Sequence, residues 1–148
     1  MTALSLAGPE DLDRLMRLVA DFHVEQEIAL SDEARRAALV PLLEGSPHGV
    51  IYLMGPARAP IGYVAVSFGW SIQFGGMDGV VDEIYIRPGV RGRGIGSEVL
   101  LALPNALAKA GLKALHLEVA RDNPRARKLY GKLGFAARDG HGLMSRRF

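Results

Sequence analysis

The sequence predicts a mixed α/β fold in which helices flank a central sheet. Two observations favour this class. Short runs rich in β-branched and aromatic residues alternate with longer segments whose apolar residues recur every three or four positions. The predicted elements follow the order strand, two helices, three strands, helix, strand, helix and two strands. Because 148 residues suit one compact core, we expect a single domain over residues 1–148.

The first third of the chain predicts one strand and two helices. Residues 2–7 form the strand, and Gly8-Pro9 opens a helix with Pro near its first turn. Five apolar residues then recur at helical spacing: Leu12, Leu15, Met16, Val19 and Phe22. Ser31 is a candidate N-cap for the second helix, which Pro41 should kink or end.

The middle of the chain predicts three strands. Residues 49–54 and 61–68 are apolar runs on either side of a turn that contains Gly and Pro, which indicates a hairpin. Residues 70–79 contain three glycines, so we expect a loop there. The third strand covers residues 80–87.

The last third predicts two helices and three strands. The first helix covers about residues 97–110, and residues 115–121 alternate as a strand does. Asn123-Pro124 has the pattern of an N-cap followed by a first helical position, and Gly134 ends this second helix. Residues 136–148 have room for two short strands.

Composition limits the function. Hydrophobic residues make up 49% of the chain and charged residues 23%, without the apolar run of about 20 residues that a membrane span requires. Cysteine is absent, which excludes disulfides, thiolate zinc sites and a cysteine nucleophile. The first five residues do not resemble a secretory signal. We expect a cytoplasmic protein with no membrane partner and no bound metal.

The formal net charge of +2 is too small for a protein that binds nucleic acid by broad phosphate neutralisation. The basic residues are grouped, and solvation explains this grouping as well as a phosphate-containing ligand does. The groups are Arg87, Arg91 and Arg93; Arg121, Arg125, Arg127 and Lys128; and Arg146 and Arg147.

A glycine-rich segment joins the third central strand to the next helix. Its residues are Arg91, Gly92, Arg93, Gly94, Ile95, Gly96 and Ser97. Unpaired N–H groups and the helix dipole favour an anion at a helix N-terminus, and glycines let the backbone approach phosphate oxygens without Cβ collisions. Arg91 and Arg93 can add charge-assisted contacts. A pyrophosphate fits this segment.

Other phosphate-binding patterns fit it less well. The Walker A pattern requires Gly-Lys followed by Ser or Thr, and this loop has no lysine. The dinucleotide pattern G-x-G-x-x-G ends on Ser97 when counted from Gly92 and on Val99 when counted from Gly94. A glycine-rich turn without a ligand stays open on these residues alone.

Arg91-x-x-Gly94-x-Gly96 resembles the acetyl-CoA signature of the GNAT superfamily, [QR]-x-x-G-x-[GA], and residues 82–88 are similar to the central strand of that family. A second block resembles the later half of the family core, and it contains Leu117, Glu118, Val119, Asn123, Ala126, Leu129, Tyr130, Gly134 and Phe135. The resemblance implies a GNAT-like acyl-CoA N-acyltransferase fold with a mostly antiparallel sheet.

The same resemblance implies that acetyl-CoA donates its acetyl group directly to a primary amine in a ternary complex. Ile84, Tyr85 and Ile86 would hold the pantetheine arm, and a backbone N–H there would polarise the thioester carbonyl. The amine must lose a proton to a carboxylate or an ordered water, and Asp82 and Glu83 are the candidate carboxylates. We favour Asp82, because family members with paired acids tend to use the first. Since neighbouring strand residues point to opposite faces, we expect one of the two to reach the substrate.

Two residues of the second block receive roles from the resemblance. Tyr130 matches the tyrosine that the family commonly uses to protonate the leaving thiolate, although a core aromatic would also suit its position. Asn123 is explained by helix capping, and the resemblance adds a hydrogen bond to the pantetheine arm.

The acceptor is expected to meet the N-terminal helices and the segment before the central strand. Their acidic and aromatic residues suit a small cationic amine, although solvated helix charges explain the acids equally well: Asp21, Phe22, His23, Glu25, Glu27, Trp70, Gln73, Phe74 and Asp78. The open alternatives are a non-catalytic acyl-CoA-binding regulatory module, a protein N-terminal or lysine acetyltransferase, an enzyme for longer acyl-CoA, and another nucleotide-binding protein. Family habit also implies a homodimer through the terminal strands.

Overall fold

The computed structural model describes residues 2–148 and divides them into two compact units. The first unit extends to Leu117, and the second runs from Glu118 to Phe148. The first unit contains the sheet and most of the helical residues, and the second contains one helix.

The sheet of the first unit has five strands, which are β1 (Leu4–Leu6), β2 (Gly49–Met54), β3 (Gly62–Ser71), β4 (Gly76–Ile86) and β5 (Ala114–His116). They lie in the order β1-β2-β3-β4-β5. Neighbours pair antiparallel from β1 to β4, and β5 pairs parallel with β4. The prediction of a mixed, mostly antiparallel sheet is confirmed.

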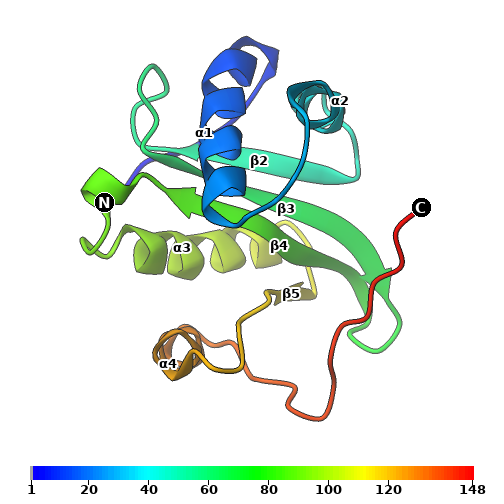
Figure 1. Cartoon of the computed structure of the whole chain (residues 1–148). Helices are drawn as coiled ribbons and strands as arrows, with labels where there is room; N and C mark the ends of the chain where they lie inside the picture. Colours follow the sequence, from blue (N-terminus) through cyan, green and yellow to red (C-terminus); the bar gives the residue numbers. More distant parts are fainter. Residues whose placement is uncertain (1) are drawn as a thin grey trace. The chain divides into compact units, whose positions relative to one another are not determined.

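Helices cover both faces of this sheet (Figure 1). Helices α1 (Leu12–Glu25) and α2 (Asp32–Leu43) lie on one face, and α3 (Ile95–Lys109) lies on the other. Ser31 caps α2 as predicted, because its Oγ accepts a hydrogen bond of 3.1 Å from the backbone N–H of Ala34. Pro41 lies inside α2 close to its end.

Apolar side chains pack on both faces of the sheet. The core under α1 and α2 consists of Ala7, Leu15, Leu18, Val19, Leu39, Leu43, Ile51, Leu53, Tyr63, Ala65 and Tyr85. Strand side chains alternate between faces, so the buried Val64 and Val66 point to the opposite side. The buried residues of α3 are Val99, Leu100, Leu103 and Leu107. Each such side chain contributes about 1.5–3 kcal/mol when it leaves water.

Strand β4 contains a β-bulge at Asp82. Ala65 pairs with Glu83 and Val66 pairs with Val81, so the register steps past Asp82. A bulge bends its strand, increases the twist and is common next to active sites. The simple alternation expected for Asp82 and Glu83 therefore does not hold at this point.

The predicted loop over residues 70–79 is wrong. Strands β3 and β4 continue through most of it, and Trp70 pairs with Met77. Gly79 lies inside β4, where a Cβ atom would come within 3.2 Å of Val66 Cγ1 and 3.3 Å of Leu115 Cδ1. This glycine marks close packing between strands and not an interruption of the sheet.

Strand β5 is shorter than predicted, because it ends at His116 and residues 117–121 are not part of a strand. The two strands predicted in residues 136–148 are also wrong, since this segment has no regular element. Glycines at 140 and 142 have low strand propensity. Residues 136–148 therefore do not supply the terminal strands through which a dimer was expected.

In the second unit, α4 (Pro124–Lys132) begins as predicted. Asn123 Oδ1 accepts a hydrogen bond of 3.1 Å from the N–H of Ala126, and Pro124 occupies the first helical position. The C-terminal segment is held by two arginines of the same unit: Arg127 bonds to Asp139, and Arg121 donates to the carbonyl of His141 at 2.9 Å.

Candidate active site

Two side chains hold the carboxylate of Glu83. Its Oε2 atom is 2.7 Å from Nε2 of His23 on α1. Its Oε1 atom accepts a hydrogen bond of 2.7 Å from the hydroxyl of Tyr63 on β3. The Glu83 side chain is 19% exposed and that of His23 is 6% exposed. Three elements of the first unit thus fix this carboxylate at the edge of the core.

Asp82 differs from its neighbour because it is exposed at the bulge. Both acids nevertheless act on Tyr63. Burial raises the pKa of the Tyr63 hydroxyl far above its ordinary value of 10.0, and the negative charges of Glu83 and Asp82 raise this pKa further. The two carboxylates predicted from the sequence therefore lie within electrostatic reach of one buried tyrosine.

Three aromatic rings pack beside these acids. Phe22 meets Tyr63 edge-on with ring centroids 6.3 Å apart, and its centroid is 5.8 Å from that of Tyr85. The Tyr63 and Tyr85 centroids are 6.2 Å apart. Edge-to-face and offset contacts of this kind add stability beyond burial alone. Tyr63 and Tyr85 are 1% and 5% exposed, so these rings belong to the core next to the acids.

Further charges surround Tyr85. Burial raises the pKa of the Tyr85 hydroxyl, and the negative charges of Asp21 and Glu25 on α1 raise it further, while those of Arg91 and Arg87 oppose the shift. The guanidinium carbon of Arg91 lies 5.5 Å from the Tyr85 ring centroid. Helix α1 therefore contributes negative charge to the same region as the acids of β4.

The predicted phosphate loop adopts a conformation that requires glycine. Gly92 has φ +78° and Gly94 has φ +77°, and no atom lies within 4 Å of a Cβ built at either residue. Gly94 is the N-cap of α3, whose first helical bond runs from Glu98 N to Gly94 O at 3.0 Å. The N–H groups that precede Glu98 belong to Ile95, Gly96 and Ser97. These groups have no earlier helical carbonyl to bond.

The two arginines of this loop have different surroundings. Arg91 Nε donates to Ile86 O at 2.8 Å, and its Nη2 lies 2.6 Å from Glu25 Oε2. Arg91 therefore ties the loop to β4 and α1. Arg93 is exposed, and within residues 2–148 its guanidinium has no ion pair or hydrogen bond. The charge of Arg93 is therefore the one open to an anion.

In the part of the chain that the structure describes, strand β4 has no strand partner on the β5 side beyond Val80. Pairing with β5 ends at Val80, whereas β4 continues to Ile86. Arg87 N donates to Ile61 O at 2.8 Å, and alternation along an antiparallel ladder then makes Tyr85 the next residue bonded to β3. The backbone groups of Ile84 and Ile86 therefore point away from β3.

Helix α4 carries the two remaining predicted residues. Asn123 is exposed, and its Oδ1 is used by the helix cap. Tyr130 is half-buried, with its ring centroid 6.3 Å from that of Phe135. Their predicted roles toward acetyl-CoA stay predictions.

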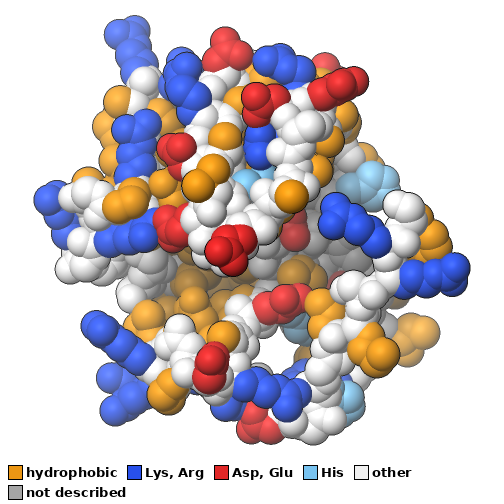
Figure 2. Space-filling view, viewed as in Figure 1, with side chains coloured by type: hydrophobic (Ala, Val, Ile, Leu, Met, Phe, Trp, Pro, Cys, Tyr) orange, Lys and Arg blue, Asp and Glu red, His pale blue; other side chains and the backbone are white. Residues whose placement is uncertain are grey.

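The residues expected around the acceptor lie on α1, just beyond its end, or on the hairpin of β3 and β4. Phe22 and His23 face the sheet, while Trp70 is 75% exposed on the β3–β4 hairpin. Asp78 Oδ2 bonds to His116 Nε2 at 3.1 Å, and the His116 ring meets Phe74 edge-on. Figure 2 shows acidic and basic side chains interspersed over α1 and α2. The acids of α1 are thus part of a mixed surface as well as neighbours of Tyr85.

Tyr63 and Arg35 bond to Glu83 and His23, respectively, but were not predicted from the sequence. Arg35 Nε lies 3.2 Å from Nδ1 of His23, and both side chains are buried. One signal was available, because His23 lies one helical turn after Val19 on the apolar stripe of α1. A polar residue at a core position needs a buried partner.

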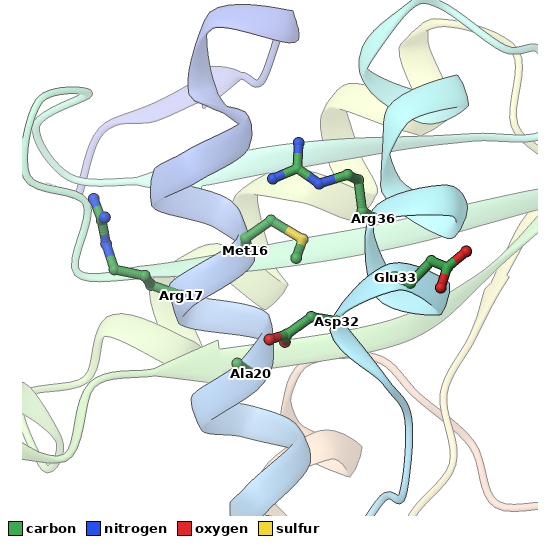
Figure 3. Close-up of a pocket in the computed structure, with 6 residues that line it drawn as sticks. All are labelled: Met16, Arg17, Ala20, Asp32, Glu33 and Arg36. Atoms are coloured by element: carbon green, nitrogen blue, oxygen red, sulfur yellow. The ribbon is translucent and has the colours of Figure 1, made fainter.

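A surface pocket of about 380 Å³ lies between α1 and α2 (Figure 3). Met16, Arg17 and Ala20 line it from α1, and Asp32, Glu33 and Arg36 line it from α2. Met16 points into the space between the helices, whereas Arg17 and Glu33 point outward in opposite directions. No predicted site residue lines this pocket, so it does not mark the chemistry of β4 and the glycine loop.

Within residues 2–148, no helix has both the length and the apolar character needed to cross a bilayer. Over the same range, no three His, Asp or Glu side chains form a group that could hold a metal ion.

Comparison with known proteins agrees with the predicted family. The profile of the acetyltransferase (GNAT) family matches residues 12–135. Over 127 residues the chain is 29% identical to thialysine N-epsilon-acetyltransferase of Bos taurus, covering 82% of this chain and 74% of that protein. The fold, the glycine loop and these matches define an acetyltransferase. The chain belongs to the GNAT family, whose members use acetyl-CoA.

Solved structures share the whole fold. An integron cassette protein from the mobile metagenome of Cole Harbour Salt Marsh is 30% identical, with a TM-score of 0.82 over 97% of this chain and 89% of its own. A predicted acetyltransferase from Clostridium acetobutylicum, solved with acetyl-CoA, is 19% identical, with a TM-score of 0.77 over 98% of this chain and 96% of its own.

Proposed function

We propose that this protein transfers the acetyl group of acetyl-CoA to the primary amine of a small cationic acceptor, by direct attack within a ternary complex. The observation that carries the proposal is the acidic and aromatic region around β4. Asp82 and Glu83 lie beside three packed rings, and Asp21 adds negative charge from α1, where Glu25 is paired with Arg91. Carboxylates attract an ammonium group through their negative charge. The bovine relative is named for acetylating an Nε amine, which supports an amine acceptor.

The glycine loop is our proposed site for the CoA pyrophosphate. The N–H groups of Ile95, Gly96 and Ser97, together with the open space above Gly92 and Gly94, suit phosphate oxygens at a helix N-terminus. Arg93 adds a charged contact, and Arg91 holds the loop against β4. When bound, acetyl-CoA supplies an acetyl group activated as a thioester.

The backbone of β4 is the proposed support for the pantetheine arm. Ile84 and Ile86 present their backbone groups on the side away from β3, and Tyr85 stays between them in the ladder. A backbone N–H from this edge would stabilise negative charge on the thioester oxygen.

Asp82 is our proposed base, acting directly or through a water molecule. It is exposed at the bulge, whereas the Glu83 side chain is only 19% exposed and is held by His23 and Tyr63. Glu83 then contributes a fixed negative charge next to the amine. Tyr130 is the proposed acid that protonates the leaving thiolate.

A screen of thiol release from acetyl-CoA tests the function. The panel contains diamines, basic amino acids and an aminoglycoside, together with peptides that offer an α-amine or a lysine. We expect release with the small cationic amines. Release with the peptides alone would overturn the acceptor class. Thermal stabilisation by acetyl-CoA without any release would instead indicate a binding module.

A further inference from the structure

Four hydrogen bonds form a chain from α2 through α1 to β4 and β3. Asp32 bonds to Arg35, Arg35 Nε bonds to His23 Nδ1 at 3.2 Å, and His23 Nε2 bonds to Glu83 at 2.7 Å. Tyr63 completes the chain on the other oxygen of Glu83 at 2.7 Å. Arg35 is 6% exposed and His23 is 4% exposed. The chain is therefore buried along most of its length.

Arg35 determines which nitrogen of His23 carries the proton. An arginine Nε always bears hydrogen and can only donate. Nδ1 of His23 must therefore accept, and the proton of the neutral ring is on Nε2. This proton points at Glu83 Oε2, which lies 2.7 Å from Nε2. A proton on Nδ1 would face the N–H of a guanidinium, so the contact with Arg35 selects the Nε2–H tautomer over the Nδ1–H tautomer.

Stability alone does not explain this chain of hydrogen bonds, because burying its charged groups has a cost in free energy. A buried guanidinium loses its hydration, and apolar residues of similar volume often stabilise a core as well or better. Here the charge of Arg35 is compensated by Asp32 and by the carbonyl of Leu30 at 2.9 Å. The other end of the chain reaches Glu83, whose side chain is 19% exposed beside the bulge at Asp82. The hydrogen-bond chain therefore leads to Glu83, at the proposed site.

We infer that His23, held as the Nε2–H tautomer by Arg35, is a positioning residue for acetyl transfer. It keeps the Glu83 carboxylate in one orientation, so that Glu83 orients the acceptor ammonium and Asp82 takes its proton. This role rests on the proposed function. His23 itself acts through Glu83 and does not touch the reacting atoms.

The tautomer is tested on the wild-type protein by ¹⁵N NMR of the histidine rings at pH 7.5. The signal of His23 is assigned by its loss in His23→Gln, and His48→Leu is the control because His48 is exposed. We expect the shift pattern of a neutral ring protonated on Nε2. A ring protonated on Nδ1 would overturn the inference. This readout needs no turnover, so it separates the inference from the proposed function.

Kinetics tests the positioning role. His23→Leu removes the donor to Glu83, and we expect kcat to fall about 10- to 100-fold, as for a reacting group displaced by a fraction of an ångström to one ångström. The KM for acetyl-CoA should not change. His23→Gln places an amide N–H near the Nε2 position and should recover most of the loss.

Variants with the wild-type kcat in an active enzyme would overturn the inference and leave the proposed function standing. If His23→Leu does not fold, Arg35→Lys serves instead, since it keeps the charge but loses the planar guanidinium donor. We expect Arg35→Lys to lower kcat and to raise the Nδ1–H population of His23. No change in either quantity would contradict the role of Arg35.

Discussion

The hydroxyl of Tyr63 donates a hydrogen bond of 2.7 Å to Glu83 Oε1, inside the core between α1 and the sheet. Hydrogen bonds to charged groups contribute about 1.5–3 kcal/mol. We expect Tyr63→Phe to lower the free energy of unfolding at pH 7 by about 1–3 kcal/mol, measured by urea denaturation. A variant as stable as the wild type would show that this bond does not hold Glu83.

Tyr63 also predicts a loss of stability in alkali. Burial raises the pKa of Tyr63 above 10.0 in the folded state, so the unfolded chain loses this proton first as the pH rises. The stabilisation is fully present below about pH 10 and declines above it by about 1.4 kcal/mol per pH unit for one group. Urea denaturation between pH 9 and 11 should show a shallower decline for Tyr63→Phe. An unchanged slope would contradict the burial effect.

Asp82 and Glu83 should respond differently to loss of charge. We expect Asp82→Asn to lower kcat about 10²- to 10⁴-fold with little change in stability, because this side chain is exposed. Glu83→Gln should lower both kcat and stability, since two buried donors would lose a charged acceptor. Steady-state kinetics and urea denaturation distinguish the two. The wild-type kcat in Asp82→Asn would transfer the role of base to Glu83 or to water.

Tyr130→Phe tests the proposed acid. The phenylalanine keeps the edge-on ring contact with Phe135 and removes only the hydroxyl. We expect unchanged affinity for acetyl-CoA by calorimetry and a kcat lowered about 10²-fold. Tyr52→Phe on β2 is the control. Equal turnover in Tyr130→Phe and the wild type would leave Tyr130 with a packing role alone.

The capping role of Asn123 can be separated from the proposed role of its amide nitrogen. Its Oδ1 accepts from Ala126 N–H at 3.1 Å, and we take the amide nitrogen as the donor to the pantetheine arm. Asn123→Asp keeps a good capping oxygen and removes that donor. We expect a KM for acetyl-CoA several-fold higher at an unchanged melting temperature. Asn123→Ala, which loses the cap as well, should also melt lower. An unchanged KM in Asn123→Asp would reduce Asn123 to a cap.

The parts of the fold that could be predicted are those marked by residues close together in the sequence. Ser31 and Asn123 are caps because their side chains bond to a backbone N–H three residues ahead, and such a pattern is visible in a short window. The glycine loop is also local, since a strand, a turn and a helix N-terminus follow one another there. The resemblance to the GNAT family extended these local signals to the whole fold.

Long-range contacts could not be predicted in the same way. His23 meets Glu83 across 60 residues, and Tyr63 meets it across 20. The bulge at Asp82 depends on the register between β3 and β4. Gly79 favours a loop in the sequence, because its close packing against Val66 and Leu115 of the neighbouring strands is not visible there. The single domain predicted over residues 1–148 stays a prediction.

Binding of acetyl-CoA to Gly94→Asp, measured by calorimetry, tests the proposed phosphate loop most directly. The matched control is Gly111→Asp, which places the same side chain at another glycine of positive φ, since Gly94 has φ +77° and Gly111 has φ +108°. Both variants should lose about 1–2 kcal/mol of stability, as expected for a non-glycine residue in the left-handed region. We predict that Gly111→Asp binds acetyl-CoA as the wild type does and that Gly94→Asp does not bind it. Equal binding by the two variants would contradict the assignment of the pyrophosphate to this loop.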